Sequence, residues 1–288
     1  MNPLTNLILD ILDLPISVAA WDIISIKLSL LLNSYGGFMF RVKYPVGARI
    51  KRVFQGSLKP IDEVPINVDS DGFLVRALSP DKNLLVEVLI PQTAFELFEV
   101  RKKTSLTVDK VLLLRSLRRV SKKDSVLMEF DENSKALKLV LINARTGMER
   151  SYLVDVKEVS SELVGSINID LPVRFQIPSE DFKKIVADAK LVDEDLELTY
   201  ENDRIIVSSS SENKMFRQTL ALDKPLYSLE AKDSRASSKY DLDLLRALAN
   251  SLTLADITTI EFGSSLPIKI SVEASDGSKI TYWVASKV

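Results

Sequence analysis

The sequence repeats itself once, and this repetition constrains the fold more than any other feature. The segment "FRVKYP" (40–45) matches "VRFQIP" (173–178), each an alternating apolar strand that ends in Pro. The turns at Asp71 and Asp203 lie 132 residues apart. The remaining matches pair 50–54 with 182–186, 126–130 with 257–262, and 151–156 with 281–286. Because all five keep a nearly constant spacing, we infer two copies of one domain.

Each copy has the same predicted order of elements: a strand, a helix, several short strands joined by Asp, Asn and Gly turns, a second helix and further strands. The second helices are predicted at 108–120 and 241–251. This pattern indicates an α+β fold, with the helices packed on one face of antiparallel sheets. We therefore predict domain 1 at 39–155, an interdomain connector at 156–172 and domain 2 at 173–288.

The first 38 residues form a leader of different composition, with only four charged residues and no basic residue before Lys27. A secretory signal would place basic residues before the apolar run. The longest uncharged run, 28–40, is too short to span a membrane. We expect residues 1–38 to lie outside the natural fold, with Met39 as the natural start and a cytoplasmic location. A peripheral amphipathic anchor is the alternative.

Two missing residue types exclude most enzyme chemistry. The chain has no Cys and no His, which excludes thiolate nucleophiles, Cys-ligated zinc and the commonest general base. Carboxylate catalysis with magnesium would remain possible. The acidic stretch 192–203 offers carboxylates, but alternation along a strand would divide them between two faces. We predict no catalytic residue, no metal and no cofactor.

The most basic stretch is "LLLRSLRRVSKKD" (112–124), in a chain of formal net charge −2. Arg115, Arg118, Arg119 and Lys122 follow at i, i+3, i+4 and i+7, which places them on one stripe of a helix. Such a stripe can simply keep a helix face in water. The other predicted helices also carry basic residues on their polar sides, so the duplicated fold would collect positive charge in one layer. That layer favours a surface that faces phosphates without reading base sequence.

Several motifs, in this order, carry a resemblance to a known family. They are "MFRVKYP" (39–45), "ALSPDKNLLVEVLIP" (77–91), "LDKPL" (222–226), "SSKY" (237–240), "GSSLPIKI" (263–270) and "TYWVASKV" (281–288). Residues 39–288 resemble an archaeal-type sliding clamp of the proliferating cell nuclear antigen (PCNA) family. The resemblance implies a ring of three subunits whose helices surround duplex DNA, and which tethers DNA replication and repair enzymes as a processivity factor.

The resemblance also implies two sets of site residues. The DNA-facing set comprises Arg52, Arg115, Arg118, Arg119, Lys122, Lys183, Lys184 and Arg246. The partner-peptide pocket beneath the connector comprises Leu78, Leu163, Val164, Ile167, Pro267, Trp283, Val284 and Ala285. Partners in this family insert a short helical turn with aromatic anchors, and they include DNA polymerase, the clamp loader, flap endonuclease and DNA ligase.

Three departures from the family pattern bear on these expectations. Ser286 stands where Pro is usual, and Trp283 where a smaller aromatic ring is common, so the pocket and its choice of partners can differ. Positive charge is sparse on the third and fourth helices. These departures fit a subunit of a heterotrimer, but a homotrimer remains open. In either ring, edge strands near 150–155 and 214–220 would pair between subunits. A magnesium-dependent nuclease and a scaffold for acidic proteins remain as alternatives.

Overall fold

A computed structural model describes residues 37–131, 133–159 and 165–287. The chain separates into two units, Met1–Phe38 and Met39–Val288, and the second is described below. Nearly all of the predicted leader lies outside the described residues, so its place outside the natural fold stays a prediction. None of the helices in the described ranges combines the length and apolarity needed to cross a membrane.

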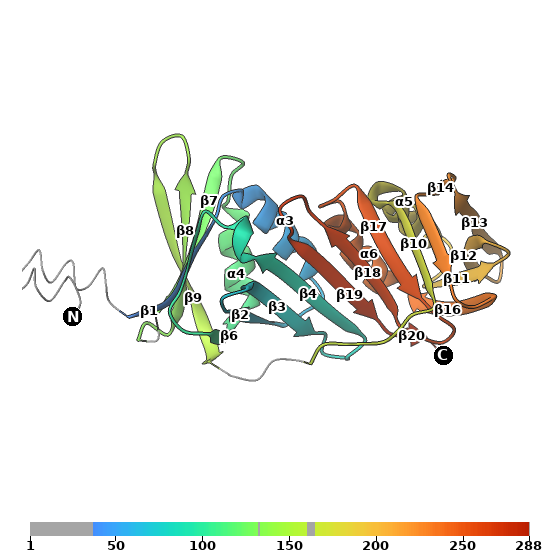
Figure 1. Cartoon of the computed structure of the whole chain (residues 1–288), viewed down its shortest axis with the longest axis horizontal. Coiled ribbons are helices and arrows are strands. Elements are labelled where there is room, and N and C mark those ends of the chain that lie inside the picture. The colour runs from blue at the N-terminus through green and yellow to red at the C-terminus, as the bar shows by residue number, and fades with distance from the viewer. Residues whose placement is uncertain (1–36, 132, 160–164, 288) are drawn as a thin grey trace, which may run out of the picture. The chain divides into compact units, whose positions relative to one another are not determined.

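The elements follow the same order in both halves of this unit (Figure 1). The first half contains β1 (Phe38–Tyr44), α3 (Gly47–Ser57), β2 (Glu63–Val68), β3 (Gly72–Leu78), β4 (Leu84–Pro91), the 3-10 helix η1 (Gln92–Ala94), β5 (Leu97–Val100), β6 (Thr104–Asp109), α4 (Lys110–Arg118), β7 (Asp124–Asp131), β8 (Ala136–Asn143) and β9 (Glu149–Val159). The second half contains β10 (Val173–Pro178), α5 (Ser179–Ala189), β11 (Asp195–Glu201), β12 (Arg204–Ser211), β13 (Lys214–Leu222), β14 (Pro225–Leu226), β15 (Ser228–Ala231), β16 (Arg235–Asp241), α6 (Leu242–Leu252), β17 (Ile257–Phe262), β18 (Ile268–Glu273), β19 (Lys279–Val284) and β20 (Ser286–Lys287). Apart from η1, β14 and β20, each element has a counterpart in the other half.

Strand pairing is almost entirely antiparallel and joins the two halves. One sheet has the order β15-β10-β17-β18-β19-β4-β3-β2-β6-β9-β8-β7-β1-β5, and the other β14-β13-β12-β11-β16-β20. The halves meet where β19 pairs with β4, from Lys279 opposite Leu89 to Val284 opposite Leu84. These sheets, with helices on one face, confirm the predicted α+β class.

Two stretches of strand have a free edge. Residues 149–155 of β9 pair with β8, and only the end of β9 reaches β6. Residues 214–220 of β13 pair with β12, while β14 contacts only Ala221 and Leu222. The other edge of each stretch therefore has no partner among the described strands.

The second helix of each half begins at an aspartate cap. The carboxylate of Asp109 accepts a hydrogen bond from the amide of Leu112 at 2.7 Å, and Asp241 caps α6 in the same way. The predicted helix 108–120 was therefore too long, because Val108 is the last paired residue of β6 before the cap. The predicted helix 241–251 is shifted by one residue for the same reason.

The four helices form one layer behind the sheet, packed in the order α4, α3, α6, α5 (Figure 1). Their apolar faces are buried in the main core, as Ile50, Leu113 and Leu245 illustrate. Helices α3 and α6, from different halves, cross at Gly56. A Cβ atom there would lie 2.7 Å from the Cβ of Ser251, so the crossing requires glycine.

A polar cluster also bonds the two halves together. The Tyr44 hydroxyl donates to Asp276 at 2.6 Å, and Arg49 donates to the same carboxylate at 2.8 Å. Partial burial alone would raise the pKa of Asp276, but hydrogen bonds from Tyr44, the Ser278 amide and Arg49 outweigh it and lower that pKa to about 2. Burial, followed by the bond to Asp276, raises the pKa of Tyr44 to about 12.

Candidate nucleic-acid interface and connector pocket

The helix layer presents exposed arginines on the side away from the sheet. Arg52 on α3, Arg115 and Arg118 on α4, and Arg246 on α6 are all exposed. None of the four forms an ion pair with a described residue. Because the opposite face of each helix is fixed in the core, these charges must point to solvent.

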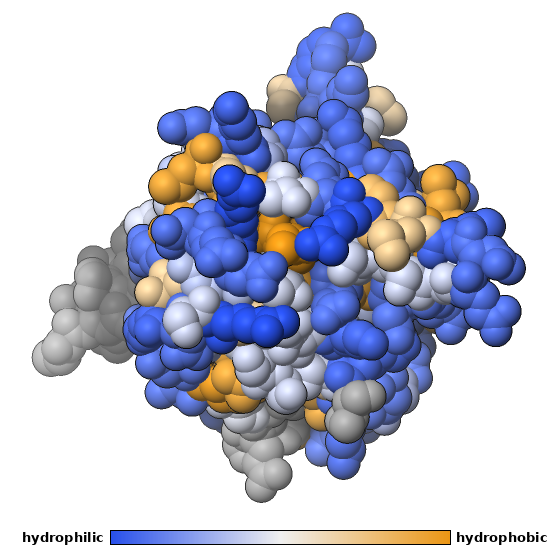
Figure 2. Space-filling view, turned by 90° about the vertical axis from the view of Figure 1, so that its right-hand side faces the viewer, coloured by the Kyte–Doolittle hydropathy of each residue, from blue (hydrophilic) through white to orange (hydrophobic). Residues whose placement is uncertain are grey.

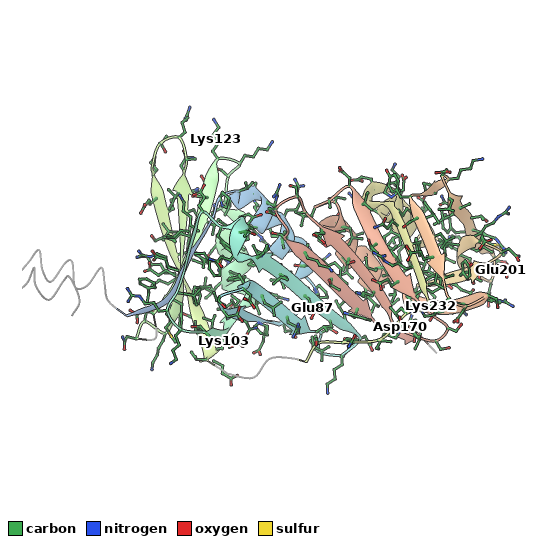
Figure 3. All side chains as sticks on the ribbon, viewed as in Figure 1. Glu87, Lys103, Lys123, Asp170, Glu201 and Lys232 are labelled. Atoms are coloured by element: carbon green, nitrogen blue, oxygen red, sulfur yellow. The ribbon has the colours of Figure 1, made fainter. Side chains whose placement is uncertain are left out.

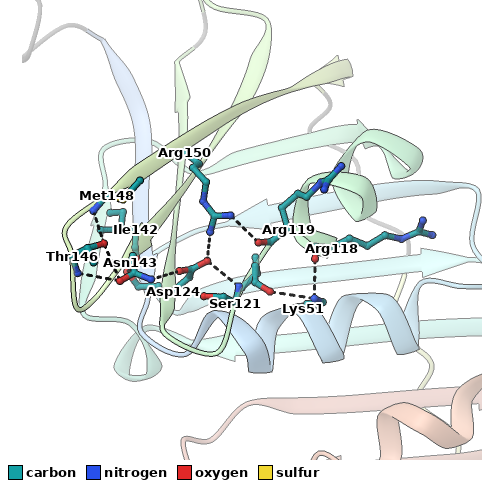
Figure 4. Close-up of polar contacts among 12 residues, drawn as sticks. Lys51, Arg118, Arg119, Ser121, Asp124, Ile142, Asn143, Thr146, Met148 and Arg150 are labelled. Atoms are coloured by element: carbon teal, nitrogen blue, oxygen red, sulfur yellow. Dashed lines mark hydrogen bonds and ion pairs between the residues drawn. The ribbon is translucent and has the colours of Figure 1, made fainter.

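The end of α4 is held by a lysine from α3. Lys51 donates to the backbone carbonyl of Arg118 at 2.9 Å and to that of Val120 at 3.2 Å (Figure 4). A cation at this position also complements the negative end of the helix dipole. Lys51 therefore positions the end of α4, and its charge is directed at these two carbonyls. The side chains of Arg118 and Arg119 extend away from Lys51 (Figure 4).

A buried carboxylate fixes the loop that follows α4. Asp124 accepts hydrogen bonds from the Ser121 amide at 2.9 Å and from Asn143 at 3.2 Å, and it forms an ion pair with Arg150 (Figure 4). Burial alone would raise the pKa of Asp124, but these hydrogen bonds and the Arg150 charge lower it. The loop that carries Lys122 is thus anchored, and Lys122 itself is exposed.

Helix α5 contributes less free charge than the sequence alone suggests. Lys183 lies 3.7 Å from Glu180 and Lys184 lies 3.5 Å from Asp181, so both lysines have a carboxylate on their own helix. A hollow of about 750 Å³ between α5 and α6 is lined by Lys183 and Arg246, among others. Of the eight predicted DNA-facing residues, Lys183 and Lys184 are locally paired. The other six form no ion pair with a described residue, and all of these lie on or at the end of a helix except Lys122, which lies on the loop after α4.

A second hollow, of about 280 Å³, lies on the opposite face of the sheet, beneath residues 167–169 of the connector. We call it the connector pocket. It is lined by Leu74, Arg76, Glu87, Leu89, Ile167, Asn168, Ile169, Lys269, Lys279, Thr281 and Trp283. Arg76 and Glu87 form an ion pair across β3 and β4 on its floor, and Figure 3 labels Glu87 in the middle of the sheet. The pocket is therefore lined by both charged and apolar side chains.

Trp283 forms part of the wall of the connector pocket. Trp283 is only 5% exposed and forms a small hydrophobic cluster with Leu85 and Leu171, against which Ile167 packs. Lys269 lies 5.5 Å from the centre of the Trp283 ring, a cation–π distance. The connector itself is tied down by Asp170 and Lys232, 2.7 Å apart and labelled in Figure 3.

The predicted pocket residues are only partly brought together. Ile167 and Trp283 line the connector pocket, whereas Leu78, Pro267 and Ala285 do not. Val284 does not line this pocket either, because alternation along β19 turns its side chain into the main core, where it is fully buried. Leu163 and Val164 lie outside the described residues.

The sequence prediction missed the polar residues of this pocket. Lys279, Thr281 and Trp283 alternate on the outer face of β19, opposite Leu89, Glu87 and Leu85 of β4. The alternation is visible in the sequence, and it identifies Lys279 and Thr281 once Trp283 is taken as an outward residue. The pairing of β19 with β4, which supplies Glu87 and Leu89, is a long-range contact that no local pattern gives.

Comparison with known proteins gives a consistent result. Residues 39–163 match the family model described as "Proliferating cell nuclear antigen, N-terminal domain". DNA polymerase sliding clamp 1 of Saccharolobus solfataricus is 26% identical over 251 residues, which cover 87% of this chain and 100% of that protein. The DNA polymerase sliding clamp of Pyrococcus furiosus is 24% identical over 250 residues, covering 86% and 98%.

Solved structures show the same fold. The PCNA of Thermococcus kodakaraensis superimposes with a TM-score of 0.78 at 19% identity and covers 86% of this chain and 100% of its own. The PCNA of Entamoeba histolytica also gives a TM-score of 0.78, at 17% identity, with coverage of 87% and 100%.

Proposed function

Because residues 39–163 match the PCNA N-terminal domain model and the chain is similar to sliding clamps over their whole length, we propose that the protein is a PCNA-type clamp that encircles duplex DNA and tethers DNA polymerase as a processivity factor. The observation that carries this proposal is the layer of four helices, whose side away from the sheet carries exposed arginines that form no ion pair with a described residue. Relatives over the full length of this unit are named DNA polymerase sliding clamps, which favours this function over a magnesium-dependent nuclease or a scaffold for acidic proteins.

Contact with DNA is electrostatic and independent of sequence. Arg52, Arg115, Arg118 and Arg246 can each approach a phosphate, and each contact releases counterions. Reading base edges would require side chains placed deep in a groove, whereas these arginines stand on a broad helix layer. Weak, exchangeable phosphate contacts suit a collar that must slide, because strong contacts would slow it.

Processivity in such a protein comes from topology. A closed ring stays on DNA without tight binding, and the two free edges on β9 and β13 give each subunit the means to join two neighbours. We propose a ring of three subunits, each formed by two domains at 39–155 and 173–288 that are joined by the connector at 156–172.

The connector pocket is the proposed docking site for short peptide motifs of the tethered enzymes, which we take to include the clamp loader, flap endonuclease and DNA ligase besides polymerase. Ile167 and Trp283 supply its apolar wall, and Lys279 supplies a positive charge that forms no ion pair with the described residues. Since the bulky Trp283 ring is packed into this wall and is nearly buried, a partner must either fit beside the ring or displace it. We therefore expect a narrower choice of partners than an open apolar pocket would allow.

The test is retention on DNA of defined topology. The full chain is loaded onto nicked circular plasmid and onto the same plasmid after linearisation, and the bound fraction is measured after gel filtration. We expect retention on the circle and loss from the linear form. The variant R115E/R118E should become loaded onto the circle, and stimulate polymerase, at least tenfold less than the unmodified chain, because both steps need the phosphate contacts.

The matched control is R145E/R204E, which makes the same change in charge at two exposed arginines outside the helix layer. It should behave as the unmodified chain does. Equal retention on linear and circular DNA, or equal loss in both double variants, would contradict the proposal.

A further inference from the structure

The connector pocket continues into a second hollow on the same face of the sheet. This hollow, of about 580 Å³, is lined by residues of β10, β17, β18 and β19, and Lys269 and Lys279 line both it and the connector pocket. We propose that Lys279 selects partner peptides that carry an acidic side chain beside their aromatic anchor. The inference rests on the proposed docking of peptides at the connector pocket and adds a charge requirement to it.

The strand register gives Lys279 different neighbours on its two sides. The pairing of β18 with β19 sets Glu273 opposite Lys279, and the pairing of β19 with β4 sets Leu89 opposite Lys279 on the other side. Because side chains alternate along strands, all three point to the outward face. Leu89 lines the connector pocket, whereas Glu273 lines only the second hollow. A peptide in the connector pocket therefore approaches Lys279 from the side that has no carboxylate.

The other charges of the connector pocket already have partners. Arg76 forms an ion pair with Glu87, and Lys269 lies 2.9 Å from Glu261. Of the charged side chains that line this pocket, Lys279 alone forms no ion pair with a residue in 37–131, 133–159 or 165–287. The pocket thus carries one positive charge without a partner, which favours an anionic group in the bound peptide.

Partial burial makes this charge more selective than a lysine on an open surface. Lys279 is half-buried, and the apolar side chains of Leu89 and Ile169 line the same pocket. Water screens a charge less at such a site, so an ion pair formed there is stronger than a fully exposed pair. A bound peptide covers the lysine further. An acidic residue compensates the covered charge, whereas a basic residue leaves two cations together, so the site favours one and rejects the other.

The geometry of β19 places the acidic residue along the peptide. Trp283, at the apolar wall, and Lys279 lie at the two ends of one outward row of the strand, with Thr281 between them. At the rise of a strand, roughly 13 Å separates the two positions. An extended peptide spans this distance in about four residues. We therefore place the carboxylate about four residues from the aromatic anchor.

Glu273 limits the selectivity of Lys279. Its exposed carboxylate lies in the second hollow, on the far side of the lysine, and repels a further acidic group. Removal of this charge should sharpen the preference for acidic peptides, and removal of the lysine should abolish it. These opposite effects at two neighbouring residues are expected from electrostatic selection and not from a purely structural role of Lys279.

The test uses the full chain and fluorescein-labelled peptides that share a Phe-Phe anchor. Four residues from the anchor they carry Glu, Gln or Lys, in one set before the anchor and in another set after it. By fluorescence anisotropy, the Glu peptide of one set should bind at least fivefold more tightly than the Lys peptide. K279E should reverse this order, K279Q should bind both peptides equally, and E273Q should widen the preference at least twofold.

The matched control is K102E, which makes the same change in charge at an exposed lysine of the β5–β6 turn and should leave the order unchanged. Binding at other apolar surfaces is limited at the end that carries β13, because this end is mainly hydrophilic with small, separate hydrophobic patches (Figure 2).

The outcomes separate this inference from the proposed function. Equal affinity for the Glu and Lys peptides, or the same change in K102E as in K279E, would overturn the charge requirement, while docking at the connector pocket would stand. If none of the peptides binds, docking at this pocket fails and the charge requirement fails with it. Retention on circular plasmid tests the clamp itself and does not depend on either result.

Discussion

Replacement of Asp276 by Asn should loosen the bond between the two halves of the chain and remove an acid-sensitive part of its stability. The carboxylate accepts hydrogen bonds from the Tyr44 hydroxyl at 2.6 Å and from Arg49 at 2.8 Å, and its pKa falls from the ordinary 3.8 to about 2. An amide of the same size can still accept from Tyr44, but it cannot form the ion pair with Arg49.

The expected magnitude follows from the shift in pKa. Each pKa unit is equivalent to about 1.4 kcal/mol, so the shift sets an upper bound of roughly 2.5 kcal/mol. The side chain retains 20% exposure, so solvent screening reduces the expected contribution to about 1–2 kcal/mol. Since the folded-state pKa lies below the unfolded one, this stability is present in full above about pH 4 and is lost as the pH falls from about 4 towards 2.

The assay is urea unfolding of the full chain, followed by circular dichroism, at pH 7 and at steps between pH 4 and pH 2.5. At pH 7, D276N should have a free energy of unfolding about 1–2 kcal/mol below that of the original chain, and the difference should shrink as the pH falls. The control D233N removes an exposed carboxylate that forms no ion pair with the described residues, and it should leave the profile unchanged. If D276N loses stability between pH 4 and pH 2.5 as steeply as the original chain does, the reasoning is wrong.

Three further substitutions test other contacts. K51M should lower the free energy of unfolding by about 1 kcal/mol, because the carbonyl of Arg118 loses its hydrogen bond; urea unfolding measures this effect. It should also weaken DNA retention in the plasmid assay without removing a DNA contact. G56V should destabilise the unit by more than about 2 kcal/mol, since the new side chain meets Ser251. The control G147A places its Cβ where no atom lies within 4 Å, so it should destabilise the unit less despite the positive φ of Gly147. Thermal unfolding compares the two variants. W283A should lower the free energy of unfolding by about 3–5 kcal/mol and enlarge the connector pocket. Peptides with an aromatic anchor should then bind more tightly, as measured by fluorescence anisotropy. Unchanged peptide affinity would contradict the view that the Trp283 ring narrows the pocket.

Much of the fold could be predicted because the relevant patterns are local. The alternation of "FRVKYP" and "VRFQIP" predicts strands, and the spacing of Leu113 and Leu117 predicts the buried face of a helix. Once that face is fixed, the opposite side carries Arg115 and Arg118 to the surface. The basic layer was thus predictable, although an aspartate cap shortened one helix by two residues at its start.

What the sequence by itself determined about this protein is its duplication, its class of fold and the family that it resembles, because each depends on the order and spacing of residues along the chain. Only the tertiary structure decided what individual polar and aromatic side chains do. Lys51 holds a carbonyl 67 residues away, and Arg49 pairs with Asp276 across 227 residues. Trp283 packs against Leu85 and lines the connector pocket because β19 lies beside β4. These contacts depend on packing between segments that are distant in the sequence, so no local pattern of residues predicts them.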